Sequence, residues 1–153
     1  TLFQLAHDYI IHSPQPFDTR SLSMVAWAFA TMKDRACQDL LRNMAGAFMA
    51  GAFAAGLAAG DDARPVTLTN MVWALATVRA HVPREVLRPI FTAAADELES
   101  FKAHELSVTL WACARLSAYH ESLFAEAISL VHRDQRLREE IHSQGIANLL
   151  WAF

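Results

Sequence analysis

Apolar residues recur along this chain with the spacing of an α-helix, and the same pattern returns in four places. In each copy alanine follows the tryptophan, and the positions two and five residues before and after it form an apolar stripe, which is broken only by Thr109 and ends two residues after Trp151 in the last copy. At about 100° per residue, these positions lie within about 40° of the point opposite the tryptophan. The stripe comprises Leu22, Val25, Phe29 and Met32; Leu68, Met71, Leu75 and Val78; Leu106, Thr109, Cys113 and Leu116; and Ile146, Leu149 and Phe153. Each copy is therefore predicted to be a largely buried helix with one apolar face and small shoulders that allow close helix packing.

The spacing of the copies indicates a repeat array. Trp27, Trp73, Trp111 and Trp151 are 46, 38 and 40 residues apart, and a period of about 20 to 50 residues is typical of such arrays. Second helices are predicted over 36–56, 84–98 and 122–136, with Ser122 as the N-cap of the last, and over 1–11 before the first copy. The predicted fold is all-α, an α-solenoid of tandem helix-turn-helix repeats of about 38–46 residues.

We expect one array to fill the whole chain, and we expect the chain to be a fragment of a longer array. Its predicted divisions are 1–13 as the end of a preceding repeat, 17–62, 63–101 and 102–141 as three repeats, and 142–153 as the start of a fourth.

The longest repeat contains an uncharged stretch rich in alanine and glycine, at 45–60. A membrane segment is one interpretation, but the stretch is shorter than the roughly 20 apolar residues of a span and is weakly hydrophobic. We interpret it as part of a tightly packed second helix and expect no membrane span.

Composition narrows the functional classes. The chain is 54% hydrophobic and 19% charged, which is globular rather than disordered. The net charge of −3 shows no excess of basic residues that would indicate a nucleic-acid partner, although basic residues can still be concentrated on one face. Cys37 and Cys113 are interpreted as small buried hydrophobes of a reducing compartment.

Catalytic chemistry has no recognisable signal here. The sequence contains no glycine loop that would cradle phosphate, no nucleophile motif and no useful pairing of acids, and its histidines lack metal-ligand spacing. We therefore expect no enzyme, no cofactor and no metal site. The charged run 133–140 is interpreted as a solvated helix end with internal ion pairs.

The repeated phrase, Leu-(Ser/Thr/Ala)-x-x-x-Trp-Ala-x-Ala, resembles the signature helix of octotricopeptide repeats. It is also similar to the related heptatricopeptide repeats and to the helical arrays that precede RAP domains. Gly145–Phe153 is the best match, and Thr69–Thr77 is next. The resemblance implies paired helices of about 38 residues in an α-solenoid. It also implies a protein of mitochondria or chloroplasts that binds organellar RNA and acts in RNA stability, processing, translation or ribosome assembly.

The chain departs from this family in two ways. The asparagine usual three residues before the tryptophan is present at Asn70 and Asn148 but is replaced by Met24 and Val108 in the other copies. The spacing of 46 residues also exceeds the family's repeat length.

An array of this kind would read single-stranded RNA with a few polar side chains from each first helix. Residues that share the tryptophan side by angle, or follow it closely, are predicted to make these contacts. They are Ser23, Thr31 and Lys33; Thr69, Asn70, Thr77 and Arg79; Ser107 and Arg115; and Asn148. The alternative is that these residues bond neighbouring helices or water. The tryptophans are interpreted as filling the gap between consecutive repeats, with base stacking as the alternative.

A second function fits the same fold. The acidic balance, the irregular spacing and the high apolar content favour a protein-interaction scaffold, such as a structural subunit of a mitochondrial ribosome or another large organellar complex. A continuous positive strip along the groove lined by the first helices would favour RNA, and a neutral or apolar one would favour protein.

Overall fold

The structure is a computed structural model that describes residues 2–12, 18–32, 37–54 and 64–153. Every regular element in this part of the chain is helical, so the all-α prediction is confirmed for it. The helices are α1 (Leu2–His12), α2 (Thr19–Thr31), α3 (Gln38–Ala54), α4 (Arg64–Val78), α5 (Arg84–Asp96), the 3-10 turn η2 (Leu98–Ser100), α6 (Ala103–Arg115), α7 (Glu121–Arg133), α8 (Gln135–Glu140) and α9 (Ser143–Ala152).

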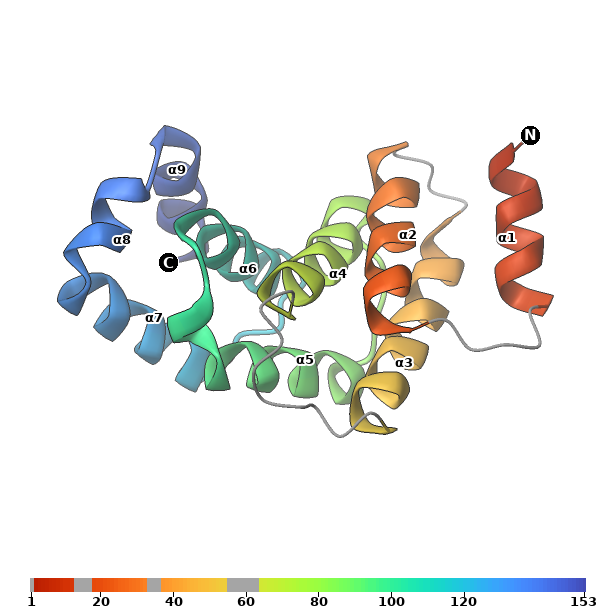
Figure 1. Cartoon of the computed structure of the whole chain (residues 1–153), viewed down its shortest axis with the longest axis horizontal. Coiled ribbons are helices and arrows are strands. Elements are labelled where there is room, and N and C mark those ends of the chain that lie inside the picture. Colours follow the sequence, from red (N-terminus) through yellow and green to blue (C-terminus); the bar gives the residue numbers. More distant parts are fainter. Residues whose placement is uncertain (1, 13–17, 33–36, 55–63) are drawn as a thin grey trace.

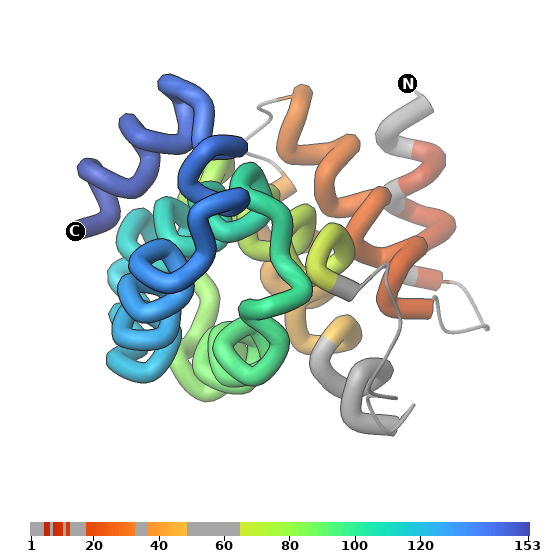
Figure 2. The backbone as a smooth tube through the Cα atoms, turned by 60° about the vertical axis from the view of Figure 1, so that its left-hand side comes forward, coloured from red at the N-terminus to blue at the C-terminus, as the bar shows by residue number. Residues whose placement is uncertain are grey.

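The helices that carry the tryptophans pack against one another in chain order. Helix α2 contacts α4, α4 contacts α6, and α6 contacts α9. The helices between them form a second row, in which α3 contacts α5 and α5 contacts α7. Figure 1 shows α5 and α7 below α4 and α6, and Figure 2 shows the arrangement from a second side. In both views α1 lies at the end of the molecule beside α2.

The predicted apolar stripe builds the core between the two rows. In α4 all four stripe residues are buried, and in α6 three of the four are buried, including Thr109 and Cys113. Opposite them, α5 contributes the buried side chains Leu87, Ile90 and Phe91 to the same cluster. In α4 and α6 the stripe thus marks the side that meets the second row.

The fourth copy differs from the prediction of a largely buried helix. No residue of α9 is buried, and the stripe residues Ile146 and Phe153 are 50% and 64% exposed. The physical reason is local. Among the described helices α9 packs mainly against α6, so the stripe of α9 lacks the cover that α5 gives to the stripe of α4.

Polar caps set several helix ends. The Asp18 carboxylate accepts a hydrogen bond from the Ser21 backbone N–H at 2.7 Å, which lowers the pKa of Asp18 and begins α2. The prediction that Ser122 caps α7 is wrong, because the His120 ring accepts from the Leu123 N–H instead. The predicted helix 122–136 is also two helices. Asp134 ends the first and caps α8 by accepting from the Leu137 N–H at 3.0 Å.

Helices α4 and α6 end in the same backbone motif. Arg79 and Ser117 follow their helices with φ of 55° and 53°. In the first turn, Ala80 N–H donates to the Leu75 carbonyl at 2.9 Å, and in the second, Ala118 N–H donates to the Cys113 carbonyl at 3.0 Å. Bonds of this span after a left-handed residue define the Schellman motif, whose usual residue is glycine.

Ser117→Gly is therefore expected to raise the free energy of unfolding by about 0.5–1 kcal/mol. A left-handed conformation costs an ordinary residue about 1–2 kcal/mol, and the greater freedom of glycine in the unfolded chain offsets part of the gain. Chemical denaturation measures the change. Ser117→Ala is the control, because it retains a Cβ and should leave stability nearly unchanged. A loss of stability in the glycine variant would contradict the assigned turn.

Both cysteines are buried, as the sequence analysis predicts. Burial raises the pKa of Cys113 to about 12, and its Sγ donates to the Ala118 carbonyl at 2.9 Å. This thiol therefore stays protonated and closes the turn after α6.

The described helices include none that is both long enough and apolar enough to cross a membrane. Helix α3 contains the first part of the alanine- and glycine-rich stretch, up to Ala54. Residues 55–60 of that stretch lie outside the described residues.

Candidate nucleic-acid interface

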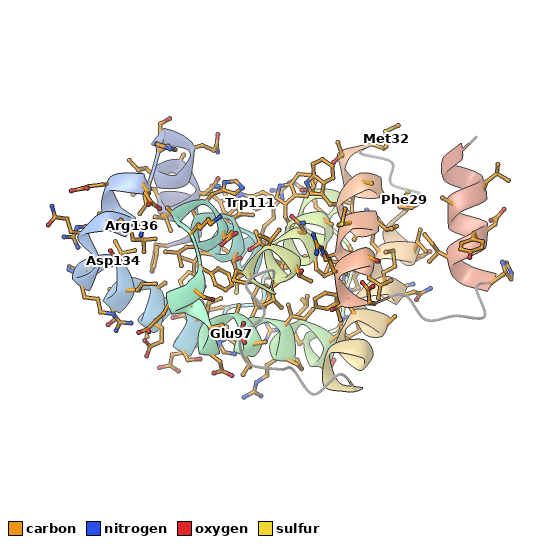
Figure 3. The ribbon with its side chains drawn as sticks, viewed as in Figure 1. Phe29, Met32, Glu97, Trp111, Asp134 and Arg136 are labelled. Carbon is orange, nitrogen blue, oxygen red and sulfur yellow. The ribbon has the colours of Figure 1, made fainter. Side chains whose placement is uncertain are left out.

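One side of the tryptophan-bearing helices is turned away from the second row. It is formed by the tryptophan and by the residues seven and three positions before it and four positions after it, which share one side of a helix. We call this surface the tryptophan face. Its accessible members are Arg20, Met24, Trp27 and Thr31; Val66, Asn70, Trp73 and Thr77; His104, Trp111 and Arg115; and Gln144, Asn148 and Trp151. Figure 3 shows Trp111 on the side away from α5, with Glu97 on the opposite side.

The four tryptophans form two pairs across neighbouring helices. The ring centroids of Trp27 and Trp73 are 6.1 Å apart, and those of Trp111 and Trp151 are 6.4 Å apart. Both distances lie in the range of favourable aromatic contacts. The interpretation of these residues as links between consecutive repeats is thus supported by the pairing. Trp27 and Trp151 are not core residues, however, since they are 48% and 55% exposed.

Charge is unevenly distributed between the two rows. The helices α2, α4, α6 and α9 contain a single carboxylate, Glu105, which is 7% exposed and accepts from the Lys102 backbone N–H at 2.8 Å. The accessible ionisable side chains of the tryptophan face, Arg20, His104 and Arg115, are all basic types. The second row and its connections carry most other described acids. The overall acidic balance therefore does not extend to the tryptophan face.

Three of the predicted RNA contacts are buried. Ser23, Thr69 and Ser107 are only 1%, 4% and 1% exposed. The Ser23 and Ser107 hydroxyls donate to the carbonyls three residues before them, and Thr69 Oγ1 lies 3.1 Å from Thr109 Oγ1 of the next helix. In this conformation their side chains do not face solvent, and their polar atoms bond inside the protein.

The reason is that the position four residues before the tryptophan faces the next helix of the row. Thr69 of α4 meets Thr109 of α6 there, and Ser107 of α6 lies against Gly145 of α9. A Cβ added at Gly145 would come within 3.4 Å of Ser107 Oγ. A small residue at this position therefore serves close packing between consecutive helices.

The other predicted contacts remain accessible where the structure describes them. Thr31 and Arg79 are exposed, and Asn70, Thr77 and Asn148 are half-buried. Thr31 Oγ1 donates to the Trp27 carbonyl at 2.8 Å, and the Asn148 side-chain oxygen accepts from Gln144 at 3.1 Å. Lys33 lies outside the described residues.

Arg115 has a structural partner as well as a surface position. Its Nε donates to the Ala76 carbonyl at 3.1 Å, near the C-terminus of α4, and its guanidinium lies 5.4 Å from the centre of the Trp111 ring. The Arg79 backbone N–H donates to the same carbonyl at 3.2 Å. The structure thus brings these two predicted contacts, from consecutive repeats, to one helix end. A cation is also favourable there because of the helix dipole.

The position seven residues before the tryptophan was not predicted as part of this surface. Arg20, Val66, His104 and Gln144 stand seven residues before their tryptophans, and all four are exposed. Each of these residues lies two helical turns before its tryptophan and therefore on the same side of the helix, so the helical periodicity alone could have identified them. The exposure of the tryptophans themselves could not be inferred in this way.

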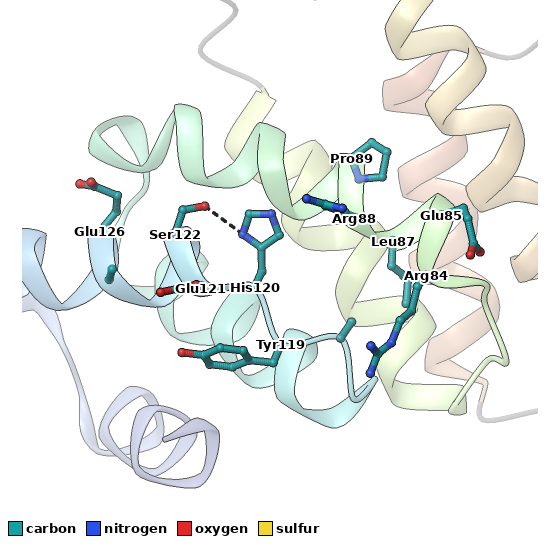
Figure 4. A pocket seen from close by; sticks show the side chains of 12 residues that line it. Arg84, Glu85, Leu87, Arg88, Pro89, Tyr119, His120, Glu121, Ser122 and Glu126 are labelled. Carbon is teal, nitrogen blue, oxygen red and sulfur yellow. Dashed lines mark hydrogen bonds between the residues drawn. The ribbon is translucent and has the colours of Figure 1, made fainter.

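A separate cavity of about 910 Å³ lies between α5 and the start of α7 (Figure 4). Its lining mixes Arg84 and Arg88 with Glu121 and Glu126. The ring of His120 is engaged on both sides: Nε2 lies 3.1 Å from Thr92 Oγ1, and Nδ1 lies 3.1 Å from Ser122 Oγ. The mixed charge favours no single ligand class, and His120 serves as a helix cap.

Metal coordination is not indicated in the described ranges, which contain no cluster of three or more histidine, cysteine or acidic residues that could hold an ion. Comparison of the chain with protein-family models, with curated proteins and with solved structures finds no match.

Proposed function

We propose that this chain is a segment of an α-solenoid that binds single-stranded RNA along its tryptophan face. The order of packing supports the solenoid, because each tryptophan-bearing helix contacts the next one and the second helices form a row beside them. The resemblance to octotricopeptide repeats supports RNA as the ligand and a mitochondrion or chloroplast as the compartment. The protein would act there in RNA stability, processing, translation or ribosome assembly, without catalysing a reaction itself.

The observation that carries the proposal is the distribution of charge. RNA phosphates are repelled by carboxylates, and the only carboxylate of the four tryptophan-bearing helices is buried and hydrogen-bonded. Arginines, amides and aromatic rings remain on that side, which are the groups that contact phosphates and bases in single strands. The cations of this face are separated by neutral and apolar residues and form no continuous positive strip, so the support for RNA comes from the lack of accessible carboxylates on the described tryptophan-bearing helices.

Salt-dependent binding tests the proposal. The chain is expected to bind a single-stranded organellar RNA pool with an affinity that falls as salt rises. Arg20→Gln should reduce the slope of log affinity against log salt by about 0.7, the contribution of one phosphate contact to a single strand. The Arg20 side chain is exposed, so the fold should persist. Fluorescence anisotropy over a salt series gives the slope.

Arg136→Gln is the matched control, because it removes one cation from α8, where Arg136 pairs with Glu140 at 2.9 Å. Its slope should equal that of the unaltered chain. Absence of RNA binding at low salt would refute the proposed function, and an equal change in the control would refute the assigned face.

Protein binding is the second candidate function, and the exposed apolar residues at one end of the molecule favour it. Ile146, Leu150 and Phe153 at α9 are 50%, 76% and 64% exposed, and Ile128 of α7 is 47% exposed. Ile128 and Phe153 line one pocket together with Leu149, and exposed apolar side chains that come together in this way are typical of protein contacts. The scaffold of a large organellar complex would use this end, whereas RNA would occupy the tryptophan face.

A further inference from the structure

Each tryptophan pair has one outer ring and one inner ring. Trp27 and Trp151 are about half exposed, whereas their partners Trp73 and Trp111 are less accessible. Ring centroids of 6.1 and 6.4 Å and interplanar angles of 32° and 48° show tilted contacts, which cover only part of each outer ring. The exposed part of each outer ring therefore stays available to a ligand.

The inner rings hold the outer rings in place. Trp73 packs against the hydrophobic core, and Trp111 does so while also carrying the Arg115 guanidinium at 5.4 Å from its ring centre. A side chain that is already ordered loses less conformational entropy when a ligand binds. The outer tryptophans are thus partly pre-organised aromatic surfaces rather than freely rotating side chains.

The groups beside the outer rings suit a nucleotide. Asn148 lies three residues before Trp151 on the same helical side, and its side-chain oxygen accepts from the Gln144 amide at 3.1 Å. Arg20 lies seven residues before Trp27 and is exposed. An aromatic ring with a cation or an amide on the same helical side is the combination that binds bases and the backbone in single strands.

We infer that Trp27 and Trp151 are stacking platforms for unpaired bases, which makes the tryptophan face selective for single strands over duplexes. The inference rests on the proposed function and adds the residues that contact the bases. Stacking is available only to bases that are not already stacked in a helix, so an annealed complementary strand removes the ligand. Because every base has an aromatic face, these two contacts distinguish single strands from duplexes and do not distinguish one base sequence from another.

The experiment titrates the chain with a single-stranded oligouridine and records both affinity and intrinsic tryptophan fluorescence. Quenching of the emission on binding is expected. Trp27→Leu and Trp151→Leu should each weaken binding by about five-fold to one-hundred-fold, the range of a lost base–aromatic stack. Trp27→Phe and Trp151→Phe should retain most of the affinity because they keep a stacking ring. Annealing the oligonucleotide to its complement should abolish the quenching.

The control is Tyr119→Leu, which removes an aromatic ring that is 71% exposed but lies in the turn before α7, outside the tryptophan face. Its affinity should be unchanged, and the circular dichroism of every variant should match that of the unaltered chain. If RNA binds without quenching, or if the leucine variants bind as tightly as the unaltered chain, the stacking inference is wrong while the proposed function stands. If no RNA binds at low salt, both are wrong.

Discussion

Phe91→Ala is expected to lower the free energy of unfolding by about 3–5 kcal/mol, the usual cost of removing a buried aromatic ring. Phe91 lies on α5 and is 0% exposed, within the cluster formed by both rows of helices. Because α5 contacts α3, α4 and α7 and Phe91 belongs to the shared core cluster, the substitution would leave a cavity in close-packed surroundings. Chemical denaturation followed by circular dichroism gives the difference.

The control for this substitution is Leu150→Ala, since Leu150 is 76% exposed and truncation of a surface side chain changes stability by no more than about 0.5 kcal/mol. A Phe91→Ala variant that is no less stable than Leu150→Ala would show that α5 does not pack against the other helices as described. A loss in the expected range would place the core between the two rows.

Thr69→Val is expected to lower the free energy of unfolding by about 1–3 kcal/mol, although it preserves the shape of the side chain. Thr69 Oγ1 lies 3.1 Å from Thr109 Oγ1, and the two residues are 4% and 0% exposed. The substitution removes the hydroxyl partner of Thr109 and leaves a buried polar group that water cannot reach. Unfolding in urea, with the same two-state analysis for every variant, measures the loss.

The double variant Thr69→Val, Thr109→Val isolates the interaction. With both hydroxyls removed, the α4–α6 contact becomes apolar and should be nearly as stable as in the unaltered chain. Thr31→Val is the matched control, because Thr31 is exposed and its hydroxyl bonds only the Trp27 carbonyl of its own helix among the bonds described. Additive losses in the double variant would mean that the two threonines do not pair.

Local regularity explains what could be predicted about the fold. Helical periodicity identified the tryptophan-bearing helices, and the burial of Leu68, Met71 and Leu75 confirms which side of α4 faces the core. The break at Asp134 was missed because the apolar pattern continues through it: Leu130 and Leu137 are both buried, on either side of the break. A single capping residue such as Asp134 is a weaker sequence signal for the end of a helix than the apolar periodicity that continues on both sides of it.

The candidate site was predicted less completely, for a reason that Thr69 and Arg115 illustrate. Their angular positions around the helix place both residues on the tryptophan side. These positions do not show which edge of that side the next helix covers. Packing of α6 on α4 buries Thr69, and it lets Arg115 of α6 reach the Ala76 carbonyl at the end of α4. The exposure of Trp27 and Trp151 depends in the same way on two other contacts, α2 with α4 and α9 with α6.

The sequence by itself therefore determined the helical class of the described residues and the core side of α4 and α6, because these depend on periodicities within one segment. Only the tertiary structure decided which polar residues of the tryptophan side meet solvent and which meet another helix. That choice depends on the crossing of consecutive helices, which is a property of two segments about 40 residues apart. The Thr69–Thr109 contact and the paired tryptophans are both products of that crossing.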